Sequence, residues 1–217
     1  MSDDKKFMDD KKITDITPNI LIKEYLNNTS ELKNLDCVSE MFDTVDRALF
    51  ISDITPELAD AIEHVIRIYN VMDKDLSIEE RQPIKLFINS DGGSALGCLE
   101  IIDSIALSKT PVYTINIGMA ASAALDVFIC GHKRFCYPNA TFLFHEGSTA
   151  PGMLDAGKFR NYSDWYEKLL QRLKNICLAH TKVTPELYKE KKNDDWWFFA
   201  DEAIEYGFCD EILKEFI

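Results

Sequence analysis

The sequence lacks long hydrophobic runs and any excess of positive charge. No apolar segment in its 217 residues approaches the ~18 residues that a membrane-spanning helix needs. The formal net charge of -13, from 24 basic and 37 acidic residues, disfavours binding to a nucleic-acid backbone. No basic stripe interleaved with aromatic residues offsets that charge. We therefore expect neither a membrane partner nor a nucleic-acid partner.

The sequence also lacks an apolar leader and a disulfide pattern. Its first residues have no hydrophobic stretch of the kind found in secretory signal peptides. The six cysteines lie mostly inside apolar segments, which indicates reduced thiols and a cytoplasmic protein. Residues 1–20 contain the tetrapeptide Asp-Asp-Lys-Lys twice and are too polar to pack, so we expect a mobile tail there. Residues 21–217 are expected to form a single domain with one sizeable core, because 46% of the chain is hydrophobic.

Apolar segments alternate between strand and helix patterns along the chain. This alternation predicts an α/β fold in which strand-helix units place parallel strands in one sheet. The expected strands are 47–51, 84–89, 112–117 and 141–144, and the expected helices are 55–71, 95–107, 123–130 and 156–179. The last of these is the longest helix, with an apolar side formed by Tyr162, Tyr166, Leu169, Leu173 and Ile176.

Ser122 lies among very small residues between an apolar strand and an apolar helix. A hydroxyl at the start of a helix meets the positive end of the helix dipole, which favours negative charge developing on oxygen. Serine is also a common helix N-cap, so this residue alone does not decide between a nucleophile and a cap. Gly131 is expected to end the helix in a left-handed conformation.

Two further segments could complete a catalytic site. Strand 141–144 is followed directly by His145, so a base can stand at a strand tip. Strand 84–89 runs into a pair of glycines ending in Gly93, where a missing side chain lets backbone N–H groups approach a ligand. The amides of Gly93 and Ala123 are therefore candidate oxyanion donors, although a Gly-Gly turn also occurs as simple punctuation.

Four separated motifs occur in an order that resembles the proteolytic subunit of the Clp protease family. They are NSDGG at 89–93, GMAAS at 118–122, KRFCYPN followed by FLFHE within 133–146, and EAIEYGFCDEIL at 202–213. The resemblance runs from about Arg47 to Leu213. Members of this family are serine peptidases that form barrel-shaped rings, so it implies a fold of the Clp and crotonase type.

The resemblance implies a role for each matching residue. Ser122 corresponds to the nucleophile, His145 to the general base, and Gly93 and Ala123 to the oxyanion donors. Catalysis by a serine peptidase needs a serine and a histidine, because a serine hydroxyl is a weak nucleophile until an imidazole takes its proton. It requires no metal and no cofactor.

The acid of the triad is less securely placed by the motifs. Counting back from residues 202–207 places the family's aspartate at Asp195, whereas a slip of one residue would select Asp194. Asp126, one helical turn after Ser122, stands where the family usually has an apolar residue, and the sequence assigns it no role.

The expected function is hydrolysis of peptide bonds in protein and peptide substrates inside a homo-oligomeric ring. Residues 152–159 nearly spell a phosphate-binding loop, but Phe159 replaces the Ser or Thr that would hold magnesium. An ATP-driven unfoldase would therefore be a separate AAA+ partner, as the resemblance implies. Two alternatives stay open: a non-catalytic ring subunit, and a crotonase-like enzyme acting on acyl-CoA thioesters.

Overall fold

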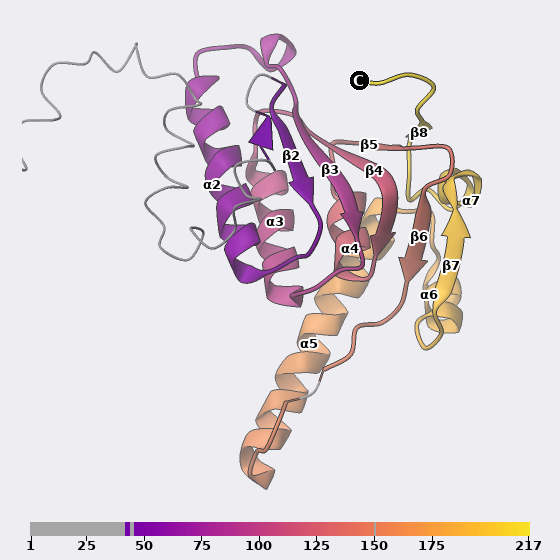
Figure 1. Cartoon of the computed structure of the whole chain (residues 1–217). Coiled ribbons are helices and arrows are strands. Elements are labelled where there is room, and N and C mark those ends of the chain that lie inside the picture. The colour runs from indigo at the N-terminus through magenta and orange to yellow at the C-terminus, as the bar shows by residue number, and fades with distance from the viewer. Residues whose placement is uncertain (1–41, 44–45, 150) are drawn as a thin grey trace, which may run out of the picture.

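The computed structural model describes residues 42–43, 46–149 and 151–217 (Figure 1). The tail predicted for residues 1–20 and the domain boundary predicted at residue 21 lie outside these ranges. Among the described helices, none combines the length and the hydrophobicity required to cross a bilayer.

One mixed sheet of eight strands forms the centre of the described chain. Its main path is β1 (Phe42–Asp43), β2 (Ala48–Ile51), β3 (Ile84–Ser90), β4 (Val112–Ala121), β5 (Lys133–Cys136) and β8 (Glu211–Ile212). Two more strands branch from it, since β6 (Thr141–Phe144) pairs with β4 and β7 (Trp196–Phe199) pairs with β6. All pairings are parallel except β1 with β2 and β6 with β7.

Helices alternate with these strands, which confirms the predicted α/β architecture. They are α2 (Pro56–Met72), α3 (Ala95–Leu107), α4 (Ala123–Ile129), α5 (Ala156–His180), α6 (Pro185–Lys191) and α7 (Ala200–Glu205), with a short 3-10 turn, η3 (Ile78–Glu80). The first two begin at side-chain caps: the Thr55 hydroxyl accepts from Leu58 N at 3.2 Å, and Ser94 accepts from Gly97 N at 3.1 Å. The predicted extent of α3 is confirmed to the residue.

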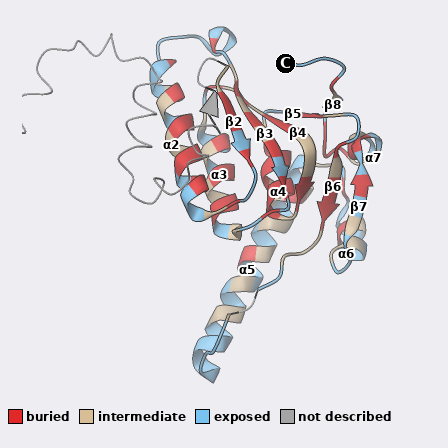
Figure 2. Ribbon diagram, in the orientation of Figure 1, coloured by how far each residue is buried: buried red, intermediate tan, exposed pale blue. Residues whose placement is uncertain are grey.

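The core lies between one face of the sheet and the helices, where the buried residues concentrate in Figure 2. Strand β3 shows this difference between the two faces of the sheet. On the face toward the helices, Ile84, Leu86 and Ile88 are fully buried, while Phe87 on the opposite face is only half-buried. Successive side chains of a strand point to opposite faces, so this alternation identifies which face the helices cover.

Helix α5 extends away from this core, as Figure 1 shows. Asp155 caps it by accepting from Gly157 N at 3.0 Å and Lys158 N at 2.9 Å. Only Leu169 and Cys177 are buried along its 25 residues, and Figure 2 shows its far end exposed. Phe159 and Trp165 of α5 are 52% and 43% exposed, so the helix offers apolar surface to a partner.

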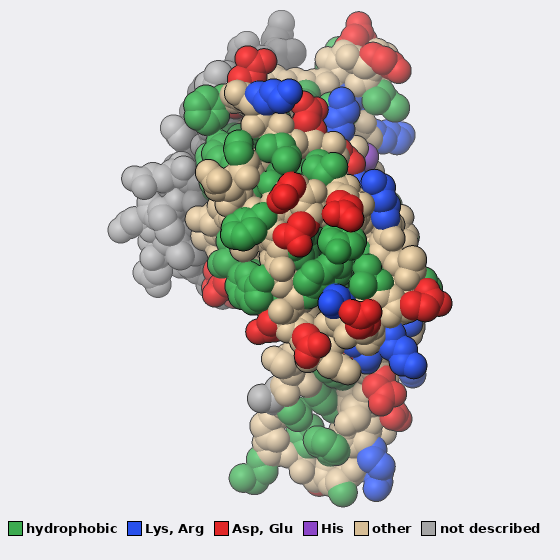
Figure 3. Space-filling model, turned by 90° about the vertical axis from the view of Figure 1, so that its right-hand side faces the viewer, with side chains coloured by type: hydrophobic (Ala, Val, Ile, Leu, Met, Phe, Trp, Pro, Cys, Tyr) green, Lys and Arg blue, Asp and Glu red, His purple; other side chains and the backbone are tan. Residues whose placement is uncertain are grey.

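Hydrophobic side chains also reach the surface near β7. Trp197 is 52% exposed and Phe199 is 58% exposed, whereas Phe198 between them is buried. Figure 3 shows one side of the molecule on which hydrophobic side chains gather among acidic ones. Exposed aromatic residues of this size mark candidate contact surfaces.

The prediction that Gly131 ends α4 in a left-handed conformation is wrong. Helix α4 ends at Ile129, and Cys130 follows with right-handed angles (φ -90, ψ -3). Gly131 is absent from the described residues with positive φ. It is needed for close packing instead, because a Cβ there would lie 2.3 Å from the Thr114 Oγ1 atom of β4.

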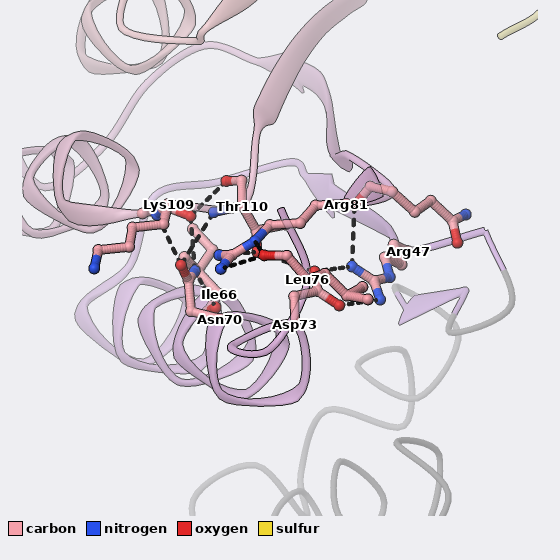
Figure 4. A network of polar contacts seen from close by, with 10 residues as sticks. Arg47, Ile66, Asn70, Asp73, Leu76, Arg81, Lys109 and Thr110 are labelled. Carbon is pink, nitrogen blue, oxygen red and sulfur yellow. Dashed lines mark hydrogen bonds and ion pairs between the residues drawn. The ribbon is translucent and has the colours of Figure 1, made fainter. Parts of the chain in front are cut away.

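A buried polar network joins the end of α2 to the strands (Figure 4). Arg47 donates two hydrogen bonds to Asp73, at 2.6 and 2.9 Å, and Thr110 donates a third at 3.0 Å. The Asn70 amide oxygen accepts from the backbone N–H groups of Lys109 and Thr110 at 2.7 and 3.1 Å. Burial alone would raise the pKa of Asp73, but the bonds from Arg47 and Thr110 outweigh it and hold that pKa below its usual value.

Replacing Asp73 with asparagine is expected to lower the free energy of unfolding at pH 7 by about 3 kcal/mol, because Arg47 would keep a buried charge without its partner. This loss of unfolding free energy should be complete above a pH of about 4, which is the pKa of an aspartate carboxyl in the unfolded chain. It should shrink as the pH falls through the lower pKa that Asp73 has in the folded protein. Urea unfolding of both proteins measures it. Asp75→Asn, on an exposed carboxylate, is the matched control. Equal unfolding midpoints for wild type and Asp73→Asn would contradict a stabilising role.

Candidate active site

Strand β4 changes neighbours along its length, and this brings the candidate site together. Residues 113–116 pair with β5, while residues 119–121 pair with β6. Strands β3, β4 and β6 are parallel, so their carboxyl ends open at the same edge of the sheet. Strand β7 is antiparallel to β6 and therefore begins at that edge.

Ser122 stands at a sharp turn between β4 and α4. Its backbone is left-handed in φ (φ 53, ψ -127), which is costly for a residue with a side chain. Its N–H donates to Leu143 O at 3.0 Å, which holds the turn against β6. The side chain makes no capping hydrogen bond to α4, so the alternative of a simple N-cap is not observed. The turn instead presents the hydroxyl away from the helix.

His145 follows directly after β6 and faces this hydroxyl. Its Nε2 atom lies 2.7 Å from the Ser122 Oγ atom. The side chain is 30% exposed. Because Ala121 pairs with Leu143, Ser122 and His145 leave the sheet within one residue of the same level. The Ser122 hydroxyl can therefore donate its proton to the imidazole.

Asp195 reaches the other nitrogen of the imidazole. Its Oδ1 atom lies 3.2 Å from the His145 Nδ1 atom. The pairing of Phe144 with Trp196 explains this contact, because His145 follows one partner and Asp195 precedes the other. Asp194 makes no hydrogen bond to the imidazole within the described chain, and its backbone N–H donates to Lys191 O at 3.1 Å. The carboxylate of Asp195 is 63% exposed, so water also reaches it.

The two adjacent glycines pack tightly between Ser122 and the start of α2. A Cβ at Gly92 would lie 2.9 Å from the Ser122 Cβ atom, and one at Gly93 would lie 2.4 Å from Ile54 O. Both glycines also have positive φ, at 118° and 135°. Ile54 N donates to Gly92 O at 2.8 Å and Ser94 N donates to Ile54 O at 2.7 Å, a pattern that turns the Gly93 N–H away from Ile54.

A cavity of about 340 Å³ adjoins Ser122 and His145. Its walls combine the starts of α3 and α4 with the end of β6 and one side of α5 and α6. The apolar and aromatic part of the lining includes Phe144, Leu169, Leu170, Leu173 and Tyr188, and Asp126 lies on the α4 side. The Tyr166 hydroxyl donates to Gly147 O at 2.7 Å and ties α5 to the segment after His145. The cavity is large enough for a side chain of a bound substrate.

Sequence patterns did not reveal this lining. Tyr188 of α6 lies far along the chain from Ser122, and no local motif marks it. Leu169 and Leu173 were expected only as an apolar side of the long helix, and their spacing of four residues was the available signal.

Charge around the imidazole is partly compensated. Glu146, next to His145, forms an ion pair with Lys192 at 2.9 Å. The backbone N–H of Glu146 also donates to Lys192 O at 3.0 Å, which fixes the two segments together. The Glu146 carboxylate beside the imidazole therefore has its own counter-ion.

Metal binding finds no support in the part of the chain that the structure describes. No three His, Cys, Asp or Glu side chains there are grouped so as to hold an ion. His132 instead accepts a hydrogen bond from Val112 N at 2.9 Å through its Nδ1 atom.

Comparison with known proteins identifies the family. The profile described as Clp protease matches residues 33–216. The chain belongs to the Clp protease family. A similar protein is the "ATP-dependent Clp protease proteolytic subunit 2" of Treponema denticola, 28% identical over 198 residues that span 88% of this chain and 95% of that protein. Proteolytic subunit 2 of Tropheryma whipplei is 34% identical over 139 residues, or 63% of this chain and 77% of that protein.

This Clp protease family member has the Clp and crotonase type of fold, as its motifs predicted. Proteolytic subunit 3 of Streptomyces avermitilis is a further relative, 36% identical over 143 residues, which cover 64% of each chain. Membership of the family supports a hydrolase that cleaves peptide bonds.

Proposed function

We propose that this chain is a serine endopeptidase in which Ser122, His145 and Asp195 form the catalytic triad. The observation that carries the proposal is the continuous contact from hydroxyl to carboxylate, 2.7 Å from Ser122 Oγ to His145 Nε2 and 3.2 Å from His145 Nδ1 to Asp195 Oδ1. A family of peptidases supplies the reaction class.

The geometry supports the following reaction. His145 takes the proton of the Ser122 hydroxyl as the oxygen attacks the carbonyl carbon of the substrate. The imidazolium then gives that proton to the leaving amine, which departs and leaves an acyl group on Ser122. Water, deprotonated by the same imidazole, hydrolyses the acyl-enzyme. Asp195 holds the Nδ1–H tautomer of His145 and stabilises its positive charge in both steps.

Backbone amides of Gly93 and Ala123 are the proposed oxyanion donors. The Gly93 N–H is directed away from Ile54, and its neighbour Gly92 leaves no room for a side chain beside Ser122. Ala123 is the first residue of α4, where N–H groups have no acceptor within the helix. Negative charge on the attacked oxygen would therefore meet two preorganised donors.

We further propose that the subunits form a ring whose chamber encloses the triads. Exposed aromatic residues on α5 and β7 support such contacts, because a single chain leaves this apolar surface in water. They are Phe159, Trp165, Trp197 and Phe199. Relatives are named as proteolytic subunits of an ATP-dependent protease. This sequence has no complete phosphate-binding loop, so the proposed source of ATP-driven unfolding is a separate AAA+ partner.

The cytoplasm is the proposed location. The five cysteines that the structure describes are all free and buried, which suits a reducing compartment.

The purified protein is expected to react with a fluorophosphonate probe and to hydrolyse short fluorogenic peptides without a partner. It should leave stable folded proteins intact, because access to the chamber limits which substrates are cut. ATP alone should change nothing, whereas ATP with a cognate AAA+ unfoldase should allow a folded substrate to be degraded. Native mass and degradation are measured together. A monomer that digests a folded protein unaided would contradict the chamber, and absence of labelling would favour a non-catalytic subunit or a crotonase-like enzyme.

A further inference from the structure

Asp126 lies one turn after Ser122 in α4 and borders the cavity beside the triad. Its backbone N–H donates to Ser122 O at 3.2 Å. Ser122 and Asp126 both line that cavity, so the carboxylate and the hydroxyl border the same space. An acidic group at this place can contact a substrate side chain held beside the nucleophile.

The Asp126 carboxylate has no counter-ion and no hydrogen-bond donor among the described residues. Its situation differs from that of Glu146, which Lys192 neutralises at 2.9 Å. In the described chain, no fully buried side-chain oxygen lacks a partner. The unpaired oxygens of Asp126 are therefore reached from open space, and the cavity that Asp126 lines provides it.

Within the described ranges, the titratable groups packed around Asp126 offer it no positive charge. Four groups have a pKa that the Asp126 charge helps to raise. They are Cys98 of α3, Cys130 after α4, Cys177 of α5 and Tyr188 of α6. Burial, with the nearby Asp126 charge, raises the pKa of each of these groups, so all four are neutral at pH 7. Burial likewise raises the pKa of Asp126 to about 7. A ligand that brings a cation would relieve the cost of this half-buried charge.

The rest of the cavity suits a long aliphatic stem. Phe144, Leu169 and Leu173 contribute apolar surface between the catalytic serine and the α5 side. Lysine and arginine combine such a stem with a cationic end, and they bury the stem readily against apolar surface. A glutamate side chain would instead place a second negative charge beside Asp126.

We propose that Asp126 binds the cationic end of a lysine or arginine whose carbonyl group Ser122 attacks, so that the enzyme selects basic residues before the cleaved bond. This inference rests on the proposed peptidase function. A charge-assisted hydrogen bond of this kind is expected to raise kcat/KM by about 10- to 100-fold over a substrate that cannot form it.

The test compares kcat/KM for two fluorogenic peptides that differ only in lysine or leucine before the cleaved bond. Wild type is expected to favour lysine by about 10-fold or more, and Asp126→Asn to lose that preference. The variant should cleave the leucine peptide faster, because leucine no longer adjoins a poorly solvated carboxylate. Asp103→Asn, which removes an exposed carboxylate of α3 outside this cavity, should leave both values unchanged.

A second measurement needs no variant. In wild type the lysine-to-leucine ratio should fall as the pH is lowered from 8 to 6, because Asp126 becomes protonated and loses its attraction for the cation. Any change in the activity of the proposed general base affects both peptides alike and cancels in the ratio. Glu146, the other carboxylate of the cavity, has its own counter-ion in Lys192. A pH-independent ratio would overturn the proposal.

Fluorophosphonate labelling separates the two possible failures. If wild type and Asp126→Asn are both labelled and show the same peptide preference, selection by Asp126 is refuted and the proposed peptidase function stands. No labelling and no cleavage by wild type would refute the peptidase, and the selection with it.

Discussion

Replacing Ser122 with alanine is expected to abolish fluorophosphonate labelling and to lower peptide hydrolysis by about a millionfold, to the background rate. The change removes the oxygen that lies 2.7 Å from His145 Nε2 and therefore the atom that would carry the acyl group. Little volume is lost, and the left-handed backbone at this position (φ 53) accepts alanine about as well as serine. Native mass should be unchanged. Labelling and peptide turnover measure the effect.

Ser104→Ala is the matched control for this experiment. The Ser104 hydroxyl donates to Glu100 O at 2.7 Å on α3, so the variant loses a hydroxyl away from the candidate site. It should label and turn over like wild type. If Ser122→Ala labelled as strongly as wild type, another residue would be the nucleophile.

Asp195→Asn is expected to lower turnover by about a thousandfold or more, whereas Asp194→Asn should change it little. An amide at position 195 can donate to the Nδ1 atom of His145, which favours the tautomer that cannot accept the serine proton. Asp194 makes no contact with the imidazole among the described residues, so its variant is a control with the same change in charge.

Steady-state kinetics on one peptide measures both variants, and the effect should appear in kcat because Asp195 acts on the imidazole rather than on the substrate. Labelling of Asp195→Asn should be slowed in proportion. The opposite ranking of the two variants would identify Asp194 as the acid.

Local sequence predicted much of this fold. Helix α3 was predicted to the residue, because Ser94 caps it and its apolar residues recur with helical spacing. Strand β6 was likewise predicted from 141 to 144. Strand β4 is longer than the predicted 112–117, since Met119, Ala120 and Ala121 are extended by pairing with β6. That pairing joins segments about twenty residues apart, and no local pattern reports it.

The residues of the candidate site also fall into those that local sequence predicted and those that depend on contacts between distant segments. Ser122 and His145 were proposed from strand ends that can be read locally, and their roles stay predictions. The choice between Asp194 and Asp195 depends on the register of β6 with β7, which is set by long-range pairing. The place of Asp126 beside α5 and α6 depends on tertiary packing, so the sequence left its role open.

The change of neighbours along β4 has a mechanical consequence. The proposed base and acid both adjoin the β6–β7 arm, the antiparallel pair that branches from β4, whereas the proposed nucleophile directly follows β4 itself. A tilt of the arm would carry His145 and Asp195 together and preserve their 3.2 Å contact. Only the 2.7 Å gap to Ser122 would open. Within the proposed triad, proton transfer from the serine is thus the link that crosses from β4 to the β6–β7 arm.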